Sequence, residues 1–335
     1  MAAKNVTMSD VAKDMGVSTV TVSKAITGKD GVSKEVREKI LQRAAEMGYT
    51  YTKGLKENGA HRQYNIGVLV ASNFMSTDAF YSNLYQRIVI ELTSQGHFGI
   101  LEIVTKDAER EAVQPNLLQN KKVDGIIMMG QMSPSYIRMI QKTEIPLIFM
   151  DFELEDIRVD SVISDGVYGA CMVTRYLISQ GHKKIGYIGS FHATSSIMDR
   201  YMGFCKAMLQ AGLPVRQEWV LPDRDEEGKY VEPVFPKDMP TAFVCNCDEV
   251  AFHVINKLKK MGCKVPGDIS VVGFDNYIYA ELSLPKITTF GVETDTMVKS
   301  AVDTIICKLK QPDYTVGRIV VSGEVYVRDS VKKIQ

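Results

Sequence analysis

Polar side chains follow short apolar runs at five places in the sequence, and their chemistry suits recognition of a small polar ligand. They are Ser72 with Asn73, Asp151, Ser164 with Asp165, Asn246 with Asp248, and Asp275 with Asn276. A carboxylate at the end of an apolar run needs hydrogen-bond donors, which a polyol supplies. Some of these residues can instead cap a following helix. We favour capping for Asp165 and Asp248, and ligand contact for Asp151 and Asp275.

The sequence lacks the common motifs of catalytic and metal sites. No GxGxxG follows an apolar run, no P-loop is present, and neither His182 nor His192 comes with an identifiable nucleophile or metal partner. Cys245 and Cys247 point to the same side of an expected strand, but no His or second Cys pair stands nearby at a ligand spacing. We therefore predict no metal, no cofactor and no catalytic residue.

The apolar runs recur at regular intervals and predict the strands that position the polar groups. They span residues 66–72, 98–105, 124–130, 146–152, 184–190, 241–248 and 269–275. Helical periodicity fills residues 80–95, 166–181, 200–212 and 249–262. Strands that alternate with helices form parallel sheets covered on both faces, and the 335 residues suffice for two. We place a break near residues 159–165 and expect segments 287–293 and 318–327 to cross back between two lobes. Facing strand ends would form a ligand cleft.

Two short helices joined by a tight turn are predicted near the N-terminus. Thr7 and Asp10 form a capping-box pattern, and Gly16 supplies the left-handed residue that ends the first helix. Ser18 caps the second helix, which Gly28 stops. The apolar stripes of the two helices comprise Val11, Ala12, Met15, Val22, Ala25 and Ile26. So short a joint makes the helices cross steeply, as in a helix-turn-helix.

A third helix is expected to close this small core. Ser33 caps it and Gly48 ends it. Its predicted apolar stripe comprises Val36, Ile40, Leu41, Ala44 and Met47.

The outward side chains of the second helix suit contact with DNA. Thr19 and Val20 lie in its first turn, where a hydroxyl and a methyl-bearing side chain can meet base edges. Lys24 can reach either the backbone or a guanine. Phosphate contacts are assigned to Ser9, Thr21, Ser23, Lys34 and Arg37, and the helix caps Thr7, Ser18 and Ser33 complete the DNA-binding set. From a generic three-helix pattern alone, a helical subdomain with solvated polar faces is an equal alternative.

Charge and composition fit a modular protein of the cytoplasm. Net charge is zero, but residues up to Arg62 hold eight Lys and three Arg against seven Asp and Glu, a surplus of four that the remaining residues cancel. This suits a nucleic-acid-binding head without deciding the case. The sequence shows no secretory signal and no apolar stretch near the roughly 18 residues of a membrane span. The six scattered cysteines are expected to stay reduced.

The head resembles a known family. The run VTMSDVAKDMGVSTVTVSKAITGKDGVSKEVREKILQRAAEMGY is similar to the DNA-binding head of the lactose-repressor (LacI) family, in which TxxDVAxxxGVSxxTVS is followed by VSxxxRxxIxxxAxxxGY. The match is nearly continuous from Val6 to Tyr49. The resemblance implies a helix-turn-helix that binds double-stranded DNA.

The connector departs from the family. Family members usually continue with PNxxARxL, a hinge that becomes helical and inserts a leucine into the minor groove. Here Tyr51 and Thr52 stand in place of Pro and Asn, and Asn58 in place of the leucine, so Leu55 is the one local candidate for a wedge. A solvated flexible linker is the equal alternative.

The body resembles the family's effector domain, which has the periplasmic sugar-binding-protein fold. Matching stretches include YNIGVLV, GHKKIGYIGS, DRYMGF and KVPGDISVVGFDNYIYAELSLPKITT. The resemblance implies that Arg200 and Asp275 are the central ligand contacts, and the further ligand-binding set is Ser72, Phe80, Asp151, Ser196, Asn246 and Cys247. Phe80 would pack on a ring face, and Asp151 and Ser196 would meet edge hydroxyls. Cys247 replaces a frequent Asn, and no aromatic stands around residues 223–225, where several members place a stacking ring.

The sequence thus predicts an all-α helix-turn-helix head plus an α/β two-lobed periplasmic-binding-protein-like effector domain. Expected bounds are 1–50 for the head, 51–64 for the hinge and 65–335 for the body, with an N-lobe of about 65–163 and 292–322 and a C-lobe of about 164–291 and 323–335. The predicted function is a sugar-responsive transcription repressor. It would bind a near-palindromic operator as a homodimer, since no heptad helix that could join dimers follows VRDSVKKIQ, and would not bind a membrane. The alternatives are a transporter-associated sugar-binding protein and a Rossmann-like enzyme.

Overall fold

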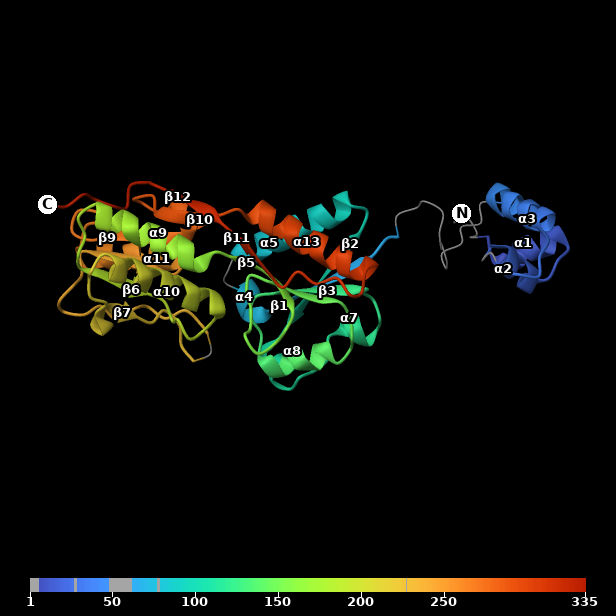
Figure 1. Cartoon of the computed structure of the whole chain (residues 1–335), viewed down its shortest axis with the longest axis horizontal. Helices are drawn as coiled ribbons and strands as arrows, with labels where there is room; N and C mark the ends of the chain where they lie inside the picture. Colours follow the sequence, from blue (N-terminus) through green and yellow to red (C-terminus); the bar gives the residue numbers. More distant parts are fainter. Residues whose placement is uncertain (1–5, 27–28, 48–61, 77–78, 227) are drawn as a thin grey trace. The chain divides into compact units, whose positions relative to one another are not determined.

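The computed structural model describes residues 6–26, 29–47, 62–76, 79–226 and 228–335. The chain divides into two compact units, Met1–Gln63 and Tyr64–Gln335 (Figure 1).

The head consists of three helices whose ends are fixed by the predicted caps. They are α1 (Met8–Met15), α2 (Thr19–Ile26) and α3 (Lys34–Glu46). The Thr7 hydroxyl accepts from the Asp10 N–H while the Thr7 N–H donates to the Asp10 carboxylate, which completes the capping box. Gly16 ends α1 with φ of 64°, and Ser18 and Ser33 accept from the N–H groups of Thr21 and Val36. The predicted helix stops Gly28 and Gly48 lie outside the described residues.

The core of the head is smaller than the predicted stripes. Six side chains are buried: Val11, Ala12, Val22, Ala25, Ile40 and Ala44. Met15, Ile26 and Met47 pack partly against them. The prediction was wrong for Val36 and Leu41, which are 39% and 45% exposed. Leu41 follows Ile40 by one residue, about 100° around the helix, so only one of the two can face so narrow a core.

Two lobes, each built on a sheet of mainly parallel strands, make up the second unit, which confirms the predicted fold class. The N-lobe sheet has the order β11-β5-β4-β3-β1-β2, and all its pairings are parallel. Its strands are β1 (Asn65–Ala71), β2 (Phe98–Val104), β3 (Gly125–Met129), β4 (Leu147–Met150), β5 (Asp160–Ser164) and β11 (Arg318–Val321). Its helices are α4 (Ser72–Ser76), α5 (Ala79–Ser94), α6 (Lys106–Arg110), α7 (Asn116–Gln119), α8 (Pro134–Gln141) and α13 (Thr294–Lys310).

The C-lobe sheet has the order β12-β10-β9-β8-β6-β7, with β12 antiparallel to β10. Its strands are β6 (Ile185–Ile188), β7 (Val220–Leu221), β8 (Ala242–Cys245), β9 (Ser270–Asp275), β10 (Thr288–Val292) and β12 (Gly323–Tyr326). Its helices are α9 (Gly166–Ser179), α10 (Ser195–Gln210), the 3-10 helix η1 (Gln217–Trp219), α11 (Asp248–Lys260) and α12 (Ile278–Leu282). The side chains of β8 alternate between two hydrophobic cores. One core lies under α9 and α10, and the other lies under α11.

The chain crosses between the lobes three times, each time through one residue. Asp165 joins β5 to α9, Glu293 joins β10 to α13, and Ser322 joins β11 to β12. The three crossings are hydrogen-bonded neighbours, because the Asp165 N–H donates to the Val321 carbonyl and the Glu293 N–H to the Ser322 carbonyl. The predicted break near residues 159–165 contains the strand β5 as well as the crossing at Asp165. Residues 318–327, which were predicted to cross back between the lobes, form two strands in different sheets.

No helix in the ranges described above is long and apolar enough to cross a membrane.

Candidate functional site

The helix α2 presents its first turn to solvent. Thr19 and Val20 are exposed, Val20 by 61%, although Val20 is apolar. The opposite face buries Val22 and Ala25 against the other two helices. The sequence of α2, TVTVSKAI, contains no carboxylate, so nothing on this helix repels a phosphate backbone. This arrangement leaves the turn that begins α2 available for contact with a duplex.

The remaining DNA-binding candidates differ in how far their side chains are exposed to solvent. Thr7, Ser9, Ser18, Ser33 and Lys34 are exposed. Thr21, Ser23, Lys24 and Arg37 are half-buried. The hydroxyls of Ser18 and Thr21 are 2.8 Å apart and bond each other. Leu55, the candidate wedge, lies outside the described residues.

Arg37 has a structural contact that the sequence did not reveal. Its Nη2 donates to the Lys29 carbonyl at 2.7 Å, and its Nε is buried without a hydrogen-bond partner among the described residues. Arg37 thereby ties α3 to the segment that follows α2. A neighbouring fork connects α3 to α1, since Arg43 donates to both carboxylate oxygens of Asp14. The pKa of Asp14 is lowered mainly by this hydrogen bond.

A second candidate site lies between the two lobes at the carboxyl ends of their strands. The cavity is lined from the N-lobe by Phe74, Phe80, Tyr81 and Asp151, and from the C-lobe by Thr194, Ser196, Ile197, Arg200, Arg224, Asn246, Cys247 and Asp275. Seven of the eight ligand-binding candidates therefore meet in one place. Ser72 is the exception. Helix α4 begins at Ser72 itself, so the chain turns there and Phe74, two residues on, lines the cavity instead.

Arg200 is the centre of the C-lobe side of this cavity. It stands in the second turn of α10, where it is buried, and its Nη2 lies 2.9 Å from Asp275 Oδ1. Its Nη1 donates to the Asn246 carbonyl at 2.6 Å, and its guanidinium carbon lies 4.0 Å from the centre of the Phe274 ring. Burial raises the pKa of the Asp275 carboxyl, and Arg200 opposes that shift. Arg200 Nε has no hydrogen-bond partner among the described residues, which leaves a buried donor at the cavity.

The two carboxylates predicted to contact ligand stand in strained backbone. Asp151 follows β4 with φ of 66°, and Asp275 ends β9 with φ of 101°. Residues other than glycine avoid this left-handed region, and such strain concentrates at functional sites. Asp151 Oδ2 accepts from the Tyr81 hydroxyl at 2.7 Å. Phe80 lies edge-on to Tyr277 of the other lobe, with ring centres 5.9 Å apart.

Sequence reasoning missed Arg224. This residue follows the two-residue strand β7, which is too short to give an apolar run. Its Nε lies 3.6 Å from Asp223 Oδ2, yet has no hydrogen-bond partner among the described residues. Asp223 is instead held by the Ser190 N–H and the Asn246 side-chain amide. A buried guanidinium donor therefore faces the cavity where several family members place a ring. Phe74, Tyr81, Thr194 and Ile197 were missed as well; Tyr81 could have been found as the second member of the Phe-Tyr pair.

Asp165 and Asp248, which were also considered in the sequence analysis, make hydrogen bonds that hold the fold. Asp165 caps α9, as predicted, through the Tyr168 N–H. Asp248 was predicted to cap α11, but Cys247 holds the cap position and the Asp248 carboxylate accepts from the Tyr277 N–H across to α12. Burial raises the pKa of the Cys247 thiol. Within the described ranges no group of His, Cys, Asp and Glu is placed to hold a metal ion.

The free space between these side chains is small. It amounts to about 40 Å³, well below the roughly 300–1,000 Å³ of small-molecule sites. A further hollow of about 190 Å³ shares Phe74, Arg224 and Cys247 with it.

Two families match separate parts of the chain. The family described as bacterial regulatory proteins, lacI family, matches residues 7–51, and the one described as periplasmic binding protein-like domain matches residues 174–331. The HTH-type transcriptional repressor PurR of Glaesserella parasuis serovar 5 (strain SH0165) is 30% identical over 339 residues, which cover 98% of this chain and 99% of that protein.

Solved structures share the fold over nearly the whole chain. The lac repressor dimer bound to operator and the anti-inducer ONPF has a TM-score of 0.73 at 21% identity, covering 98% of this chain and 100% of that one. The complex of the transcriptional regulator CelR with cellobiose has a TM-score of 0.69 at 22% identity, covering 97% and 100%.

Proposed function

Because the chain belongs to the LacI family of bacterial regulatory proteins, we propose that it is a transcription repressor that binds a near-palindromic operator and answers to a small effector between its lobes. The observation that carries this proposal is α2, a helix without carboxylates that exposes Thr19 and Val20 in its first turn. We assign base-edge contact to these two residues. Thr7, Ser9, Ser18, Thr21, Ser23, Lys24, Ser33, Lys34 and Arg37 would fix the register on phosphates or the groove wall.

The effector is proposed to be a sugar or sugar derivative. Asp151 and Asp275 offer acceptors and Arg200 offers an unpartnered donor, which together suit vicinal hydroxyls. The aromatic side chain of Phe80 would cover a ring face. A structural neighbour binds cellobiose by its description, and a relative carries the name PurR, so sugars and nucleosides belong in the same screen.

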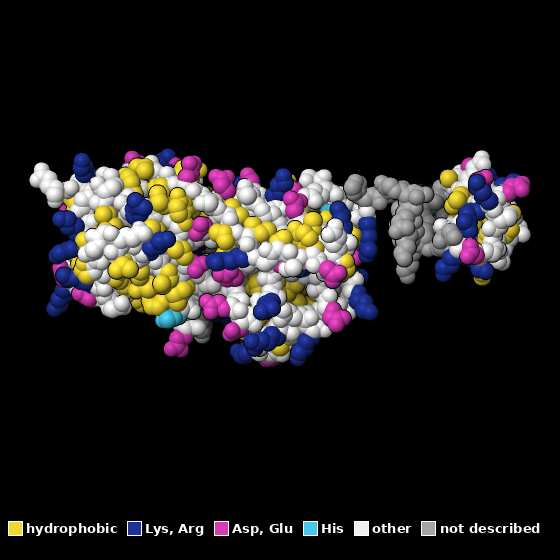
Figure 2. Space-filling model, in the orientation of Figure 1, with side chains coloured by type: hydrophobic (Ala, Val, Ile, Leu, Met, Phe, Trp, Pro, Cys, Tyr) yellow, Lys and Arg dark blue, Asp and Glu magenta, His cyan; other side chains and the backbone are white. Residues whose placement is uncertain are grey.

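The proposed mechanism is a shift between open and closed lobes. A ligand that fits one arrangement better favours it, and in a homodimer this changes the spacing of two heads. Both lobes expose large apolar side chains that a second copy could cover, such as Ile90 on α5 and Leu282 and Leu284 around α12. Figure 2 shows that apolar side chains gather in patches on the face of the body in view. We propose a dimer that acts where DNA is, in the cytoplasm.

The domain limits are proposed as 1–50 for the head, 51–64 for the hinge and 65–335 for the body. Sheet membership supports the division within the body. Strands β1 to β5 and β11 belong to one sheet, and β6 to β10 and β12 to the other. The N-lobe is accordingly proposed to span about 65–163 and 292–322, and the C-lobe about 164–291 and 323–335.

Fluorescence anisotropy of labelled duplexes tests the DNA half of the proposal. A fragment from beside the protein's own gene is compared with a scrambled duplex of equal length at low and moderate salt. We expect the native fragment to bind at least about 10³-fold tighter, and binding of both to weaken as salt rises. A protein that binds neither duplex at low salt is not a regulator of this kind.

We further propose that the chain is not an enzyme. Members of its family are described as regulatory proteins, and the cleft carboxylates are assigned above to ligand contact. Turnover of candidate glycosides by the purified protein would overturn this part.

A further inference from the structure

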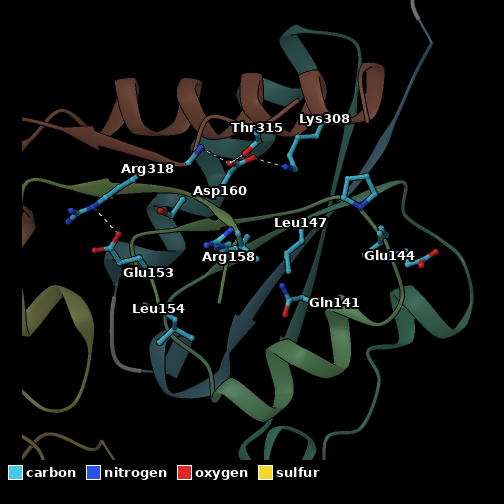
Figure 3. A pocket seen from close by; sticks show the side chains of 15 residues that line it. Gln141, Glu144, Leu147, Glu153, Leu154, Arg158, Asp160, Lys308, Thr315 and Arg318 are labelled. Carbon is cyan, nitrogen blue, oxygen red and sulfur yellow. Dashed lines mark hydrogen bonds and ion pairs between the residues drawn. The ribbon is translucent and has the colours of Figure 1, made fainter. Parts of the chain in front are cut away.

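A second cavity lies in the N-lobe and shares no lining residue with the cleft (Figure 3). Its volume is about 550 Å³, within the range of small-molecule sites, whereas the cleft leaves about 40 Å³. It opens beside the first residues of three adjacent strands, Leu147 of β4, Asp160 of β5 and Arg318 of β11. The loop from β4 to β5, which includes Glu153 and Arg158, forms another wall.

Two ion pairs lie in this cavity, and the exposed Arg158 and Glu144 belong to neither of them. Lys308 Nζ lies 2.5 Å from Asp160 Oδ2, and Arg318 Nε lies 2.8 Å from Glu153 Oε2. Arg158 has no hydrogen-bond or ion-pair partner in the part of the chain that the structure describes. Figure 3 shows the Arg158 side chain near the middle of the view, while Glu144 lies to the right of it. An anion beside Arg158 would therefore meet a cation that no carboxylate neutralises.

Hydrogen bonds within the protein hold the part of the cavity wall formed by Asp160 and residues 315–317. Asp160 Oδ1 accepts from the Thr315 hydroxyl at 2.8 Å and from the Gly317 N–H at 2.6 Å, while its other oxygen binds Lys308. These bonds hold residues 315–317 against β5. The Asp160 carboxylate is fully used, so its charge is already balanced by donors of the protein.

Five of the remaining lining residues are apolar. Ile145, Pro146, Leu147, Leu154 and Val159 line the cavity together with the Gln141 amide. Leu147 is buried, and Ile145, Leu154 and Val159 pack partly against the N-lobe core. A ligand here would gain from burying an apolar body as well as from its charge.

We propose that this cavity is a second small-molecule site that takes an anion with an apolar body, and that its occupancy changes the contact between the lobes. The coupling follows from Glu153 and Arg318, which line the cavity and also touch α10. The Glu153 N–H donates to Ser195 Oγ at 3.2 Å, and Arg318 Nη2 lies 3.7 Å from Asp199 Oδ2. Asp199 precedes Arg200, the centre of the cleft. The coupling rests on the proposed function, whereas binding in the cavity does not.

Calorimetric titration of the full chain with phenyl phosphate tests the site. Arg158→Ala and Arg158→Gln remove the free cation. Arg110→Ala is the matched control, because Arg110 is an exposed arginine of the same lobe outside the cavity. Arg224→Ala reports on binding in the cleft. We expect saturable binding that weakens at least tenfold in both Arg158 variants and stays within twofold in the other two.

Three results would overturn the site: no saturable binding to the parent chain, equal weakening by Arg110→Ala, or weakening by Arg224→Ala alone. Circular dichroism of each variant separates loss of binding from loss of fold. For the coupling, hydrogen exchange of peptides covering residues 195–200 is expected to slow at least twofold with phenyl phosphate, and not in Arg158→Gln. Unchanged exchange would overturn the coupling. The DNA titration above is run without phenyl phosphate. Absence of DNA binding in that experiment would therefore contradict only the proposed function, not binding in this cavity.

Discussion

Arg200 and Asp275 form an ion pair at 2.9 Å in which the two side chains are only 8% and 11% exposed. The pair joins the second turn of α10 to the end of β9, within one lobe. A buried pair costs desolvation that its own attraction barely offsets, so it is weak evidence of a purely stabilising role. Its place on the cleft, together with the unpartnered Arg200 Nε, favours a role in holding ligand.

Arg200→Ala should abolish the effector response and leave DNA affinity within about threefold, because the head is a separate unit. Leaving Asp275 buried without its partner costs about 3–5 kcal/mol. The melting temperature will therefore fall, and Asp275→Asn, which keeps a hydrogen-bond acceptor beside Arg200, serves as the second variant. Anisotropy with and without effector, beside thermal melts, checks the result. A response that survives in both folded variants removes the pair from the ligand site.

Thr19→Ala and Val20→Ala should each weaken binding to the native operator by about 1–3 kcal/mol while random duplex binds as before. Lys34→Ala should weaken both, because a phosphate contact does not distinguish sequences. The measurement is paired titration of the two duplexes. Lys39→Ala is the control on the same head, since Lys39 is exposed and paired with Glu35 on α3. A uniform loss for the α2 variants would contradict base-edge contact.

Arg224→Ala should weaken effector binding at least about tenfold with a smaller loss of thermal stability than Arg200→Ala. Asp223 keeps the Ser190 N–H and the Asn246 amide when Arg224 is removed, so no carboxylate is stranded. Arg216→Ala is the matched control, because Arg216 lies in the same lobe but over Trp219, away from the cleft. Ligand titration and melts of both variants decide the matter. Equal effects of the two would show that Arg224 acts on the fold alone.

Asp160 should make the body lose stability in acid. Burial would raise its pKa, but hydrogen bonds from Lys308, Thr315 and Gly317 outweigh burial and hold the pKa below its ordinary value. The unfolded chain thus binds the proton more readily, so this stabilisation is complete above the unfolded pKa and lost as pH falls through the folded one. Denaturant melts from pH 6 to 3 should show a fall in unfolding free energy that is shallower in Asp160→Asn. Asp107→Asn, at an exposed pair with Arg110, should keep the parent slope.

Sequence patterns predicted the elements whose signal is local. The caps Thr7, Ser18 and Ser33 need only their own turn, and long apolar runs such as residues 66–72 mark buried strands. Strand β5 escaped because its sequence, DSVIS, is polar in composition although all five residues are buried. Tertiary partners supply that burial, among them Lys308 on Asp160 from far along the chain.

The residues of the candidate site also fall into those that local patterns predicted and those that they did not. Arg200 and Asp275 stand in motifs and were assignable, whereas Arg224 follows a strand of two residues. Asp248 shows the opposite error. Its spacing fits a cap, but its carboxylate bonds to Tyr277, 29 positions away in the chain. Such a partner depends on how β9 and α12 pack, which a linear pattern does not contain.

The three one-residue crossings at Asp165, Glu293 and Ser322 lie side by side, linked by hydrogen bonds between neighbouring main chains. Two lobes joined by one chain connection could rotate about any axis. Three adjacent connections restrict the lobes to rotation about a single axis. A protease that nicked any one of them would leave the other two intact, and the halves would stay together and in register. The opening of the lobes proposed above would therefore be a rotation about these three adjacent connections.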